Sequence, residues 1–230
     1  MKKDTKILLT ITPIDDKTAR LVKVVGVTNE NTVFTNMGCY EGYNNYGTAE
    51  ALRIVVGEFE GKEYTITAIN GCSFSHCREL KEIFIGAQVC HIDWNMYQCV
   101  SLLNIMVDPK NKVFHDIDGV LFEGKELKAF PQGRRGKYVV PEGTKKLGNH
   151  SFKSSHIEEI VLPSSLEEIG INVFYECRSL SEIVLPPKLK KVSMNCNRNN
   201  KPISQKFFLA DDSGHTCPLT ISDVIKRFPE

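Results

Sequence analysis

The 230-residue sequence contains no long hydrophobic run, no excess of one charge and no dense set of cysteines. Without a stretch of about 18 apolar residues, it offers no candidate for a membrane-spanning helix. Its 29 basic and 28 acidic residues give a net charge of +1, which argues against a nucleic-acid-binding protein that depends on a large positive field. The start turns polar after a short apolar stretch, so we expect a cytoplasmic chain or one whose leader has been removed.

The eight cysteines are too few for a disulfide-dense scaffold. A structural zinc site usually shows a C-x2-C pair with a matching second pair, and no such arrangement occurs. We therefore predict no metal and no cofactor. The ligand sets that we considered are Cys72 with Cys77, Cys90 with His91, and His215 with Cys217.

What the sequence does contain is a repeat of about 22 residues. Six slots, written I-x4-F-x2-C-x2-L-x2-I-x-[IL], recur four times with small variations in length. Leu and Ile at fixed offsets are typical of a stacked solenoid, in which each coil buries its apolar residues against the next. The Cys slot suits a small apolar side chain in a crowded interior. The copies start at Ile69, Ile92, Leu147 and Ile169, and their Cys slots hold Cys77, Cys99, Ser155 and Cys177.

Each repeat predicts a strand that ends at a proline. The last two apolar slots alternate with period two, as in a strand with one buried face. Proline follows at Pro109, Pro163 and Pro186, and it ends the strand because it has no N–H for the ladder. Coils stacked about 4.8 Å apart would pair these strands in parallel. A second short strand in each coil is predicted at 166–169 and 189–192.

Three segments carry a resemblance to a known family: SFSHCRELKEIFI, SSLEEIGINVFYECRSLSEIVLPPKL and NKVFHDIDGVLFEGKELKAFPQG. They resemble the BspA-like leucine-rich repeat family of bacterial and protist proteins, whose AF-x-x-C-x-x-L-x-x-I-x-L-P coils alternate with longer coils containing a DGVLF hairpin. The resemblance covers residues 58–195 and departs at Met96, Tyr97 and Ser155. It implies a mainly β, right-handed α/β solenoid that is not an enzyme. It also implies a cell-surface or secreted protein that adheres to host or neighbouring-cell components.

We expect three regions along the chain. Residues 1–57 form an N-terminal β cap with a long loop, and residues 196–230 form a short C-terminal helical cap. Between them, residues 58–195 form a solenoid of about five turns. The DGVLF hairpin is an insertion at residues 108–131.

The N-terminal cap is predicted from alternating strands at 6–13 and 19–27, with strands resuming at 51–57 and 63–69. The Asn- and Gly-rich stretch 28–49 between them is typical of a loop. Three tyrosines on this loop resemble an adaptable contact surface, and we favour the alternative that they pack on the first coil. They are Tyr40, Tyr43 and Tyr46.

The C-terminal cap is predicted from apolar residues that recur with helical spacing over 221–228, with Ser222 available as the N-cap. The preceding stretch 197–206 is polar and predicts a mobile segment. Cys196 and Cys217 both lie beyond the repeats. Free thiols are the expected state, and a disulfide between these two cysteines is the alternative.

The sharpest signal for an enzyme is Asp116-Ile117-Asp118-Gly119. It resembles the nucleophile motif of Mg²⁺-dependent haloacid-dehalogenase phosphatases, in which the first Asp attacks phosphorus and the second is a general acid. That chemistry requires the two Asp residues at the carboxyl end of a central parallel strand flanked by helices. No helical pattern follows here, and Glu123-Gly124-Lys125-Glu126 is typical of a hairpin turn. We therefore favour a hairpin and keep the phosphohydrolase as the alternative. The basic cluster 134–137 predicts a solvated turn.

Strand alternation places two columns of side chains on the outer face of the solenoid, because Ile83 and Ile85 are expected to point inward. An exposed apolar column is typical of a binding surface, and we predict that this face binds a protein or peptide partner. The acidic column would select basic groups. The alternatives are a column covered by a subunit or cap, and a structural module of a larger assembly. The columns are Glu82, Asn104, Glu159 and Glu182 (mostly acidic), and Phe84, Met106, Val161 and Val184 (apolar).

Overall fold

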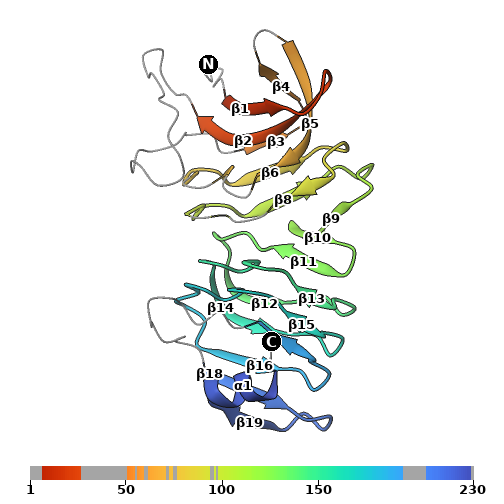
Figure 1. Ribbon diagram of the computed structural model, residues 1–230. Coiled ribbons are helices and arrows are strands. Elements are labelled where there is room, and N and C mark those ends of the chain that lie inside the picture. The colour runs from red at the N-terminus through yellow and green to blue at the C-terminus, as the bar shows by residue number, and fades with distance from the viewer. Residues whose placement is uncertain are drawn as a thin grey trace. The chain divides into compact units, whose positions relative to one another are not determined.

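The computed structural model describes residues 7–26, 51–54, 56–59, 62–70, 73–74, 77–93, 96, 98–193 and 206–228. These residues form short β-strands connected as the coils of a solenoid, which confirms the predicted fold class. The chain divides into two compact units, Met1–Leu121 and Phe122–Glu230. Within each unit, successive repeat strands are stacked on one another (Figure 1).

The described residues of unit 1 form two sheets and the hairpin strand β9. The strands of the unit are β1 (Ile7–Pro13), β2 (Thr18–Gly26), β3 (Ala51–Ile54), β4 (Val56–Phe59), β5 (Lys62–Ile69), β6 (Glu82–Ile85), β7 (His91–Ile92), β8 (Asn104–Val107) and β9 (Phe114–Ile117). One sheet has the order β1-β2-β5-β4, with β7 also paired to β5. The other has the order β3-β6-β8, and its strands run parallel, as the repeat predicts.

Unit 2 contains two series of parallel strands. Its elements are β11 (Glu126–Ala129), β12 (Arg135–Val139), β13 (Lys146–Leu147), β14 (His156–Val161), β15 (Glu168–Ile169), β16 (Glu182–Leu185), β17 (Lys191–Val192), β18 (Lys206–Ala210), β19 (Thr216–Leu219) and α1 (Ile221–Arg227). β11 and the two-residue strands β13, β15 and β17 form a parallel ladder, which we call the short-strand ladder. The long strands form the parallel pairs β12–β14 and β16–β18, and β19 is antiparallel to β18. The boundary between the units falls within β10 (Val120–Glu123).

The apolar slots of the repeat form the core, as predicted. In unit 1, Ile83 pairs in register with Ile105, and Ile85 pairs with Val107, so equivalent slots of successive coils lie side by side. All four side chains are buried. In β6 and β8 they alternate with half-buried residues, which is the pattern of strands with one face on the core.

In two coils, the thiol of the Cys slot bonds to the coil before it. The Cys99 thiol donates to the Phe74 carbonyl oxygen at 2.7 Å, and the Cys177 thiol donates to the Phe152 carbonyl oxygen at 3.0 Å. In the other Cys slot of unit 2, Ser155 Oγ lies 3.4 Å from Cys177 Sγ. Burial raises the pKa of Cys177 to about 11, so its thiol stays protonated and can act as this donor.

The DGVLF segment is a hairpin, as predicted. β9 and β10 are joined by Asp118 and Gly119, whose φ angles of 49° and 67° are both positive. Two successive positive φ angles are typical of the type I′ turn, whose twist matches the twist of the flanking strands. A second turn follows at Gly124, with φ of 55°, and leads into β11.

Two predictions about local structure were wrong. The basic cluster 134–137 is not a solvated turn, because Arg135–Val139 is the strand β12, with a register shift after Gly136 that accommodates its φ of 74°. The C-terminal helix α1 is present, but Thr220 is its N-cap instead of Ser222. Thr220 Oγ1 accepts from the Asp223 backbone N–H, and the Asp223 carboxylate accepts from the Thr220 N–H at 2.9 Å, which forms a capping box.

The strands predicted at 6–13, 19–27 and 63–69 are present as β1, β2 and β5. The strand predicted at 51–57 is two strands in different sheets, because β3 pairs with the repeat strand β6 while β4 pairs with β5. Several predictions fall outside the described residues. They are the loop 28–49 with its tyrosines, the polar stretch 197–205, Cys72 and Cys196.

Candidate interaction surface

In unit 1, the structure brings four of the predicted surface residues together on β6 and β8. Glu82 pairs in register with Asn104, and Phe84 pairs with Met106. Asn104 Nδ2 donates to Glu82 Oε1 at 3.4 Å. All four residues are half-buried, so this part of the predicted surface offers limited apolar area to a partner.

In unit 2, the apolar column is more exposed. Val139 pairs in register with Val161 across β12 and β14, and Val184 pairs with Phe208 across β16 and β18. The three valines are 57%, 38% and 41% exposed, in chain order. Phe208 is half-buried. We call these four residues the valine row.

The charged column of unit 2 contains lysines as well as glutamates. Lys137 pairs in register with Glu159, and Lys137 Nζ lies 2.7 Å from Glu159 Oε1. Glu182 pairs in register with Lys206. Since both pairs are exposed, their ion pairing contributes little stability. The two lysines balance the two glutamates beside the valine row. The net negative charge that would select a basic partner, as expected from the sequence, is therefore not present on these four residues.

Four residues of this surface were missed by sequence reasoning: Lys137, Val139, Lys206 and Phe208. A usable signal exists for the first two, because Tyr138-Val139-Val140-Pro141 matches the strand ends Ile160-Val161-Leu162-Pro163 and Ile183-Val184-Leu185-Pro186.

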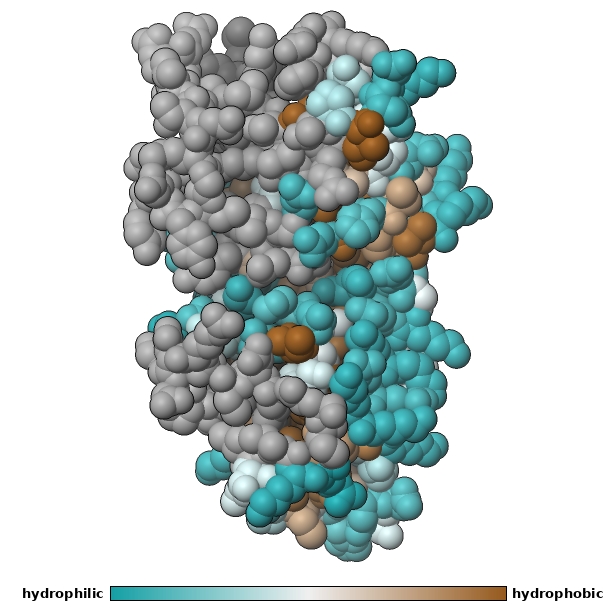
Figure 2. Space-filling model, in the orientation of Figure 1, coloured by the Kyte–Doolittle hydropathy of each residue, from teal (hydrophilic) through white to brown (hydrophobic). Residues whose placement is uncertain are grey.

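The short-strand ladder of unit 2 carries a different surface. Residues that alternate in charge lie in register along β11, β13, β15 and β17: Glu126, Lys146, Glu168 and Lys191. Lys146 Nζ lies 3.6 Å from Glu126 Oε2 and 3.7 Å from Glu168 Oε1, so one lysine joins the coils on both sides of it. The surface around β11, β13 and β15 is accordingly almost uniformly hydrophilic (Figure 2).

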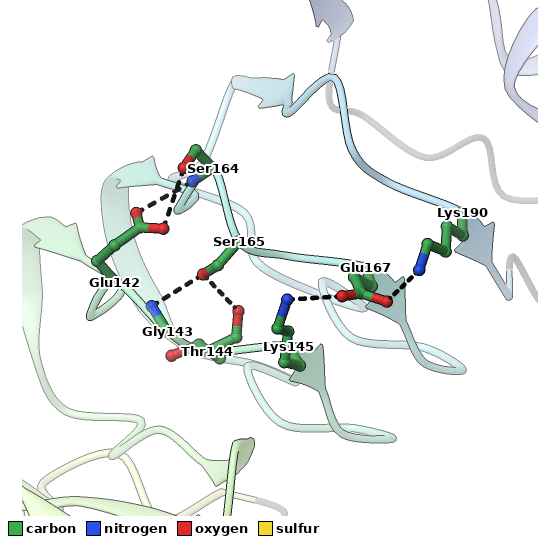
Figure 3. A network of polar contacts seen from close by, with 8 residues as sticks. All are labelled: Glu142, Gly143, Thr144, Lys145, Ser164, Ser165, Glu167 and Lys190. Carbon is green, nitrogen blue, oxygen red and sulfur yellow. Dashed lines mark hydrogen bonds and ion pairs between the residues drawn. The ribbon is translucent and has the colours of Figure 1, made fainter.

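A polar network beside this ladder ties neighbouring coils together (Figure 3). Glu142 Oε1 accepts from Ser164 Oγ at 3.0 Å, and Ser165 Oγ accepts from the Gly143 N–H at 2.9 Å. Glu167 Oε1 accepts from Lys145 Nζ at 2.6 Å, while its second oxygen accepts from Lys190. Glu167 is therefore held from the preceding and the following coil at once.

Glu167 should make stability depend on pH in the acid range. Hydrogen bonds from Lys145 and Lys190 lower the pKa of its carboxyl from 4.5 to about 2. A carboxyl with a depressed folded-state pKa stabilises the protein fully above its unfolded-state pKa, and that contribution is lost as pH falls toward the folded value. We expect Glu167→Gln to lower the urea midpoint at pH 7. The difference from wild type should shrink below pH 4.5 and vanish near pH 2.

Raising the salt concentration provides the control for this prediction. Since the Glu167 ion pairs are solvent-accessible, 1 M NaCl should reduce the difference at pH 7 through screening, with a Debye length of about 3 Å. A difference that stays constant from pH 7 to pH 2 would assign the effect to side-chain packing and contradict the prediction.

The motif that suggested a phosphohydrolase has a structural role. Asp116 lies on the hairpin strand β9, and its Oδ1 accepts from the Val107 N–H at 2.8 Å. The Ile105 N–H donates to the Gly119 carbonyl at 2.8 Å, so the hairpin occupies two donors of β8. This is not the end of a central parallel strand flanked by helices, and the phosphohydrolase alternative is not favoured.

The cysteine and histidine sets do not converge within the described part of the chain. No group there of three or more His, Cys, Asp or Glu residues is placed to hold a metal ion. Cys77 is buried in its repeat slot, whereas Cys90 and Cys217 are exposed free thiols. None of the helices in the described ranges is both long and apolar enough to cross a membrane.

Comparison with known proteins identifies the repeat. The family model for the BspA type leucine rich repeat region matches in six copies, over residues 58–133 and 129–210. No curated protein matches the sequence.

Solved structures with similarity to this chain include three bacterial proteins. A leucine-rich repeat protein from Bacteroides ovatus ATCC 8483 is 19% identical, with a TM-score of 0.44 over 88% of this chain and 51% of that chain. One from Eubacterium ventriosum ATCC 27560 is 18% identical, with a TM-score of 0.40 over 55% of this chain and 48% of that chain. A leucine rich cell surface protein from Faecalibacterium prausnitzii A2-165 is 12% identical, with a TM-score of 0.32 over 84% of each chain.

The chain spans about half the length of the first two of these proteins. Proteins built from leucine-rich repeats are typically non-catalytic and generally bind other proteins. Because the family model covers well over half of the sequence, the chain belongs to the BspA-type leucine-rich repeat family.

Proposed function

We propose that this protein is a non-catalytic adhesion module that binds a protein or peptide partner through the exposed face of its long parallel strands. The observation that carries the proposal is the valine row of unit 2. Three valines with exposed fractions of 57%, 38% and 41% occupy equivalent positions on β12, β14 and β16. Aligned apolar side chains on a sheet surface are typical of a site that a partner covers.

The charged pairs beside the valine row suit a partner that carries both signs of charge. Lys137–Glu159 and Glu182–Lys206 flank the valines, so a partner gains contact area from the row and orientation from the pairs. On unit 1, the half-buried residues Phe84 and Met106 occupy the corresponding positions of β6 and β8. We include Glu82 and Asn104 in the proposed surface as their neighbours.

The family supports a setting outside the cell, and we propose that the partner is a host or neighbouring-cell surface protein. Antibody labelling of intact source cells tests this setting, with lysed cells as the comparison. Labelling of intact cells is expected, and labelling that requires lysis would contradict it.

The binding test uses two aspartates in the valine row. Val161→Asp with Val184→Asp should weaken binding to a panel of host extracellular proteins at least tenfold, because both charges would be desolvated at the interface. Surface plasmon resonance of the immobilised variant gives the change in Kd. Both valines are exposed, so the fold should persist, and circular dichroism checks this.

Ile171→Asp is the matched control. Ile171 is 38% exposed and also lies in unit 2, but it is in the turn after β15, outside the long strands. Ile171→Asp also replaces an exposed aliphatic side chain with a carboxylate, and it should leave Kd unchanged. Equal effects of the two variants would remove the valine row from the proposed function. Failure of the wild type to bind any panel member would instead favour a structural module of a larger assembly.

A further inference from the structure

The end of the long-strand sheet in unit 2 has an unusual edge. β19 is the outer strand of the β16-β18-β19 sheet, and three of its four residues are exposed. An exposed outer strand normally offers a row of backbone N–H and C=O groups to another chain, which makes it a site of edge-to-edge association.

The hydrogen-bond phase of the β18–β19 hairpin determines which groups of β19 point outward. Residue pairs of antiparallel strands alternate between those that exchange hydrogen bonds and those that do not. The Asp211 N–H donates to the His215 carbonyl at 2.9 Å, so Asp211–His215 is a hydrogen-bonded pair, and the alternation can be followed from it along the hairpin. Leu209–Cys217 and Phe207–Leu219 are then hydrogen-bonded pairs, and Ala210–Thr216 and Phe208–Pro218 are not.

It follows that Thr216 and Pro218 direct their backbone polar groups away from β18. Thr220, two residues after Pro218, is the next residue whose backbone groups point away from β18, and it lies just after the end of the strand. Pro218 has no N–H, so the central outward donor of the edge is missing. The Thr220 N–H is bonded to Asp223 Oδ2 at 2.9 Å through the capping box of α1. Of the three outward positions, Thr216 alone directs a backbone donor toward an approaching strand.

We propose that Pro218 and the Thr220–Asp223 capping box act together as a blocked edge that prevents a second copy of this chain from pairing with β19. Pro218 removes a donor, and its ring occupies the space where an incoming strand would place a carbonyl. Asp223 withdraws the next donor into α1. The same helix cap that starts α1 therefore also protects the sheet.

The test restores both donors. Pro218→Val with Asp223→Ala should tighten self-association at least tenfold relative to wild type, measured by sedimentation equilibrium in reducing buffer. Cys217→Val is the matched control, because it adds a valine to β19 while its N–H faces β18. It should associate as the wild type does. The proposal is overturned if the double variant associates no more tightly than either protein.

Amide hydrogen exchange of the wild type tests the premise without any substitution, and it decides the matter if the double variant does not fold. The Thr216 amide should exchange fast, and the amides of Cys217 and Leu219 should be protected. Protection of Thr216 alone would mean that Pro218 faces β18 and not outward. Fast exchange at all three positions would mean that β19 is not stably paired with β18. Either result overturns the proposal.

Discussion

Asn111→Ala should lower the free energy of unfolding by about 2–4 kcal/mol, because this side chain satisfies four backbone groups at once. Its Nδ2 donates to the Gly86 carbonyl at 2.9 Å and to the Val89 carbonyl at 2.8 Å. Its Oδ1 accepts from the Val113 N–H at 2.9 Å and from the Phe114 N–H at 2.8 Å. Asn111 thereby fastens the segment before the DGVLF hairpin to the preceding coil, and urea denaturation measures the loss.

Asn111→Asp separates the two halves of this interaction. The carboxylate keeps the acceptor for the N–H groups of Val113 and Phe114, but it places negative charge against the carbonyls of Gly86 and Val89. We expect a loss at pH 7 at least as large as that of Asn111→Ala. A loss under about 0.5 kcal/mol for Asn111→Ala, the range of ordinary surface substitutions, would show that the four bonds do not hold the coil.

Phe152→Ala should cost about 3–5 kcal/mol, the range observed when a buried aromatic residue is removed. Phe152 is 1% exposed, and its ring centroid lies 4.8 Å from that of Phe130 and 5.7 Å from that of Phe174. Tyr138 packs on the same ring at 6.0 Å. The Phe slot of one coil therefore contacts the coils on both sides, so the cavity left by alanine would reach three coils.

The conservative variant Phe152→Leu is the control, with an expected loss of about 1.5 kcal/mol or less because leucine keeps most of the volume. Both losses are measured as changes in the free energy of unfolding in urea. Equal losses for the two variants would mean that aromatic contact, and not the filling of space, is what the slot requires.

The repeated coils could be predicted because each apolar slot recurs at nearly fixed spacing. Ile83 and Ile105 lie 22 positions apart in the sequence and side by side in the structure. The Asp118-Gly119 turn was predictable as well, because few residue pairs adopt two positive φ angles. For these features, residues that occupy the same position in the sequence pattern are also neighbours in the structure.

The strand β12 was missed because the hairpin insertion interrupts the period of the repeat just before it. The remaining signal is four residues long, Tyr138 to Pro141, and Arg135-Gly136 at its start favours a turn. Missing β12 also meant missing the partner of Glu159, so the charged column was expected to be acidic. The positive charge of Lys137 neutralises the negative charge of Glu159.

The N-cap of α1 could have been predicted from the sequence by a local rule. A capping box needs an acidic or amide residue three positions after the cap, and Asp223 stands three after Thr220. Ser222 is followed at that distance by Ile225, which cannot accept a hydrogen bond. The valine row, in contrast, required knowing which strands pair, and pairing depends on the complete stack.

The spacing of the inter-coil bonds constrains how such a chain can change length during evolution. The bonds of Cys177 to Phe152, Glu167 to Lys145 and Lys190 to Glu167 span 25, 22 and 23 residues. A tandem duplication of 22 or 23 codons would insert one complete coil with its apolar slots in register, but it would place Glu167 opposite its own copy, where the chain now has a lysine. A duplication a few codons shorter or longer would also move the apolar slots out of register with those of the neighbouring coils, and purifying selection would remove it.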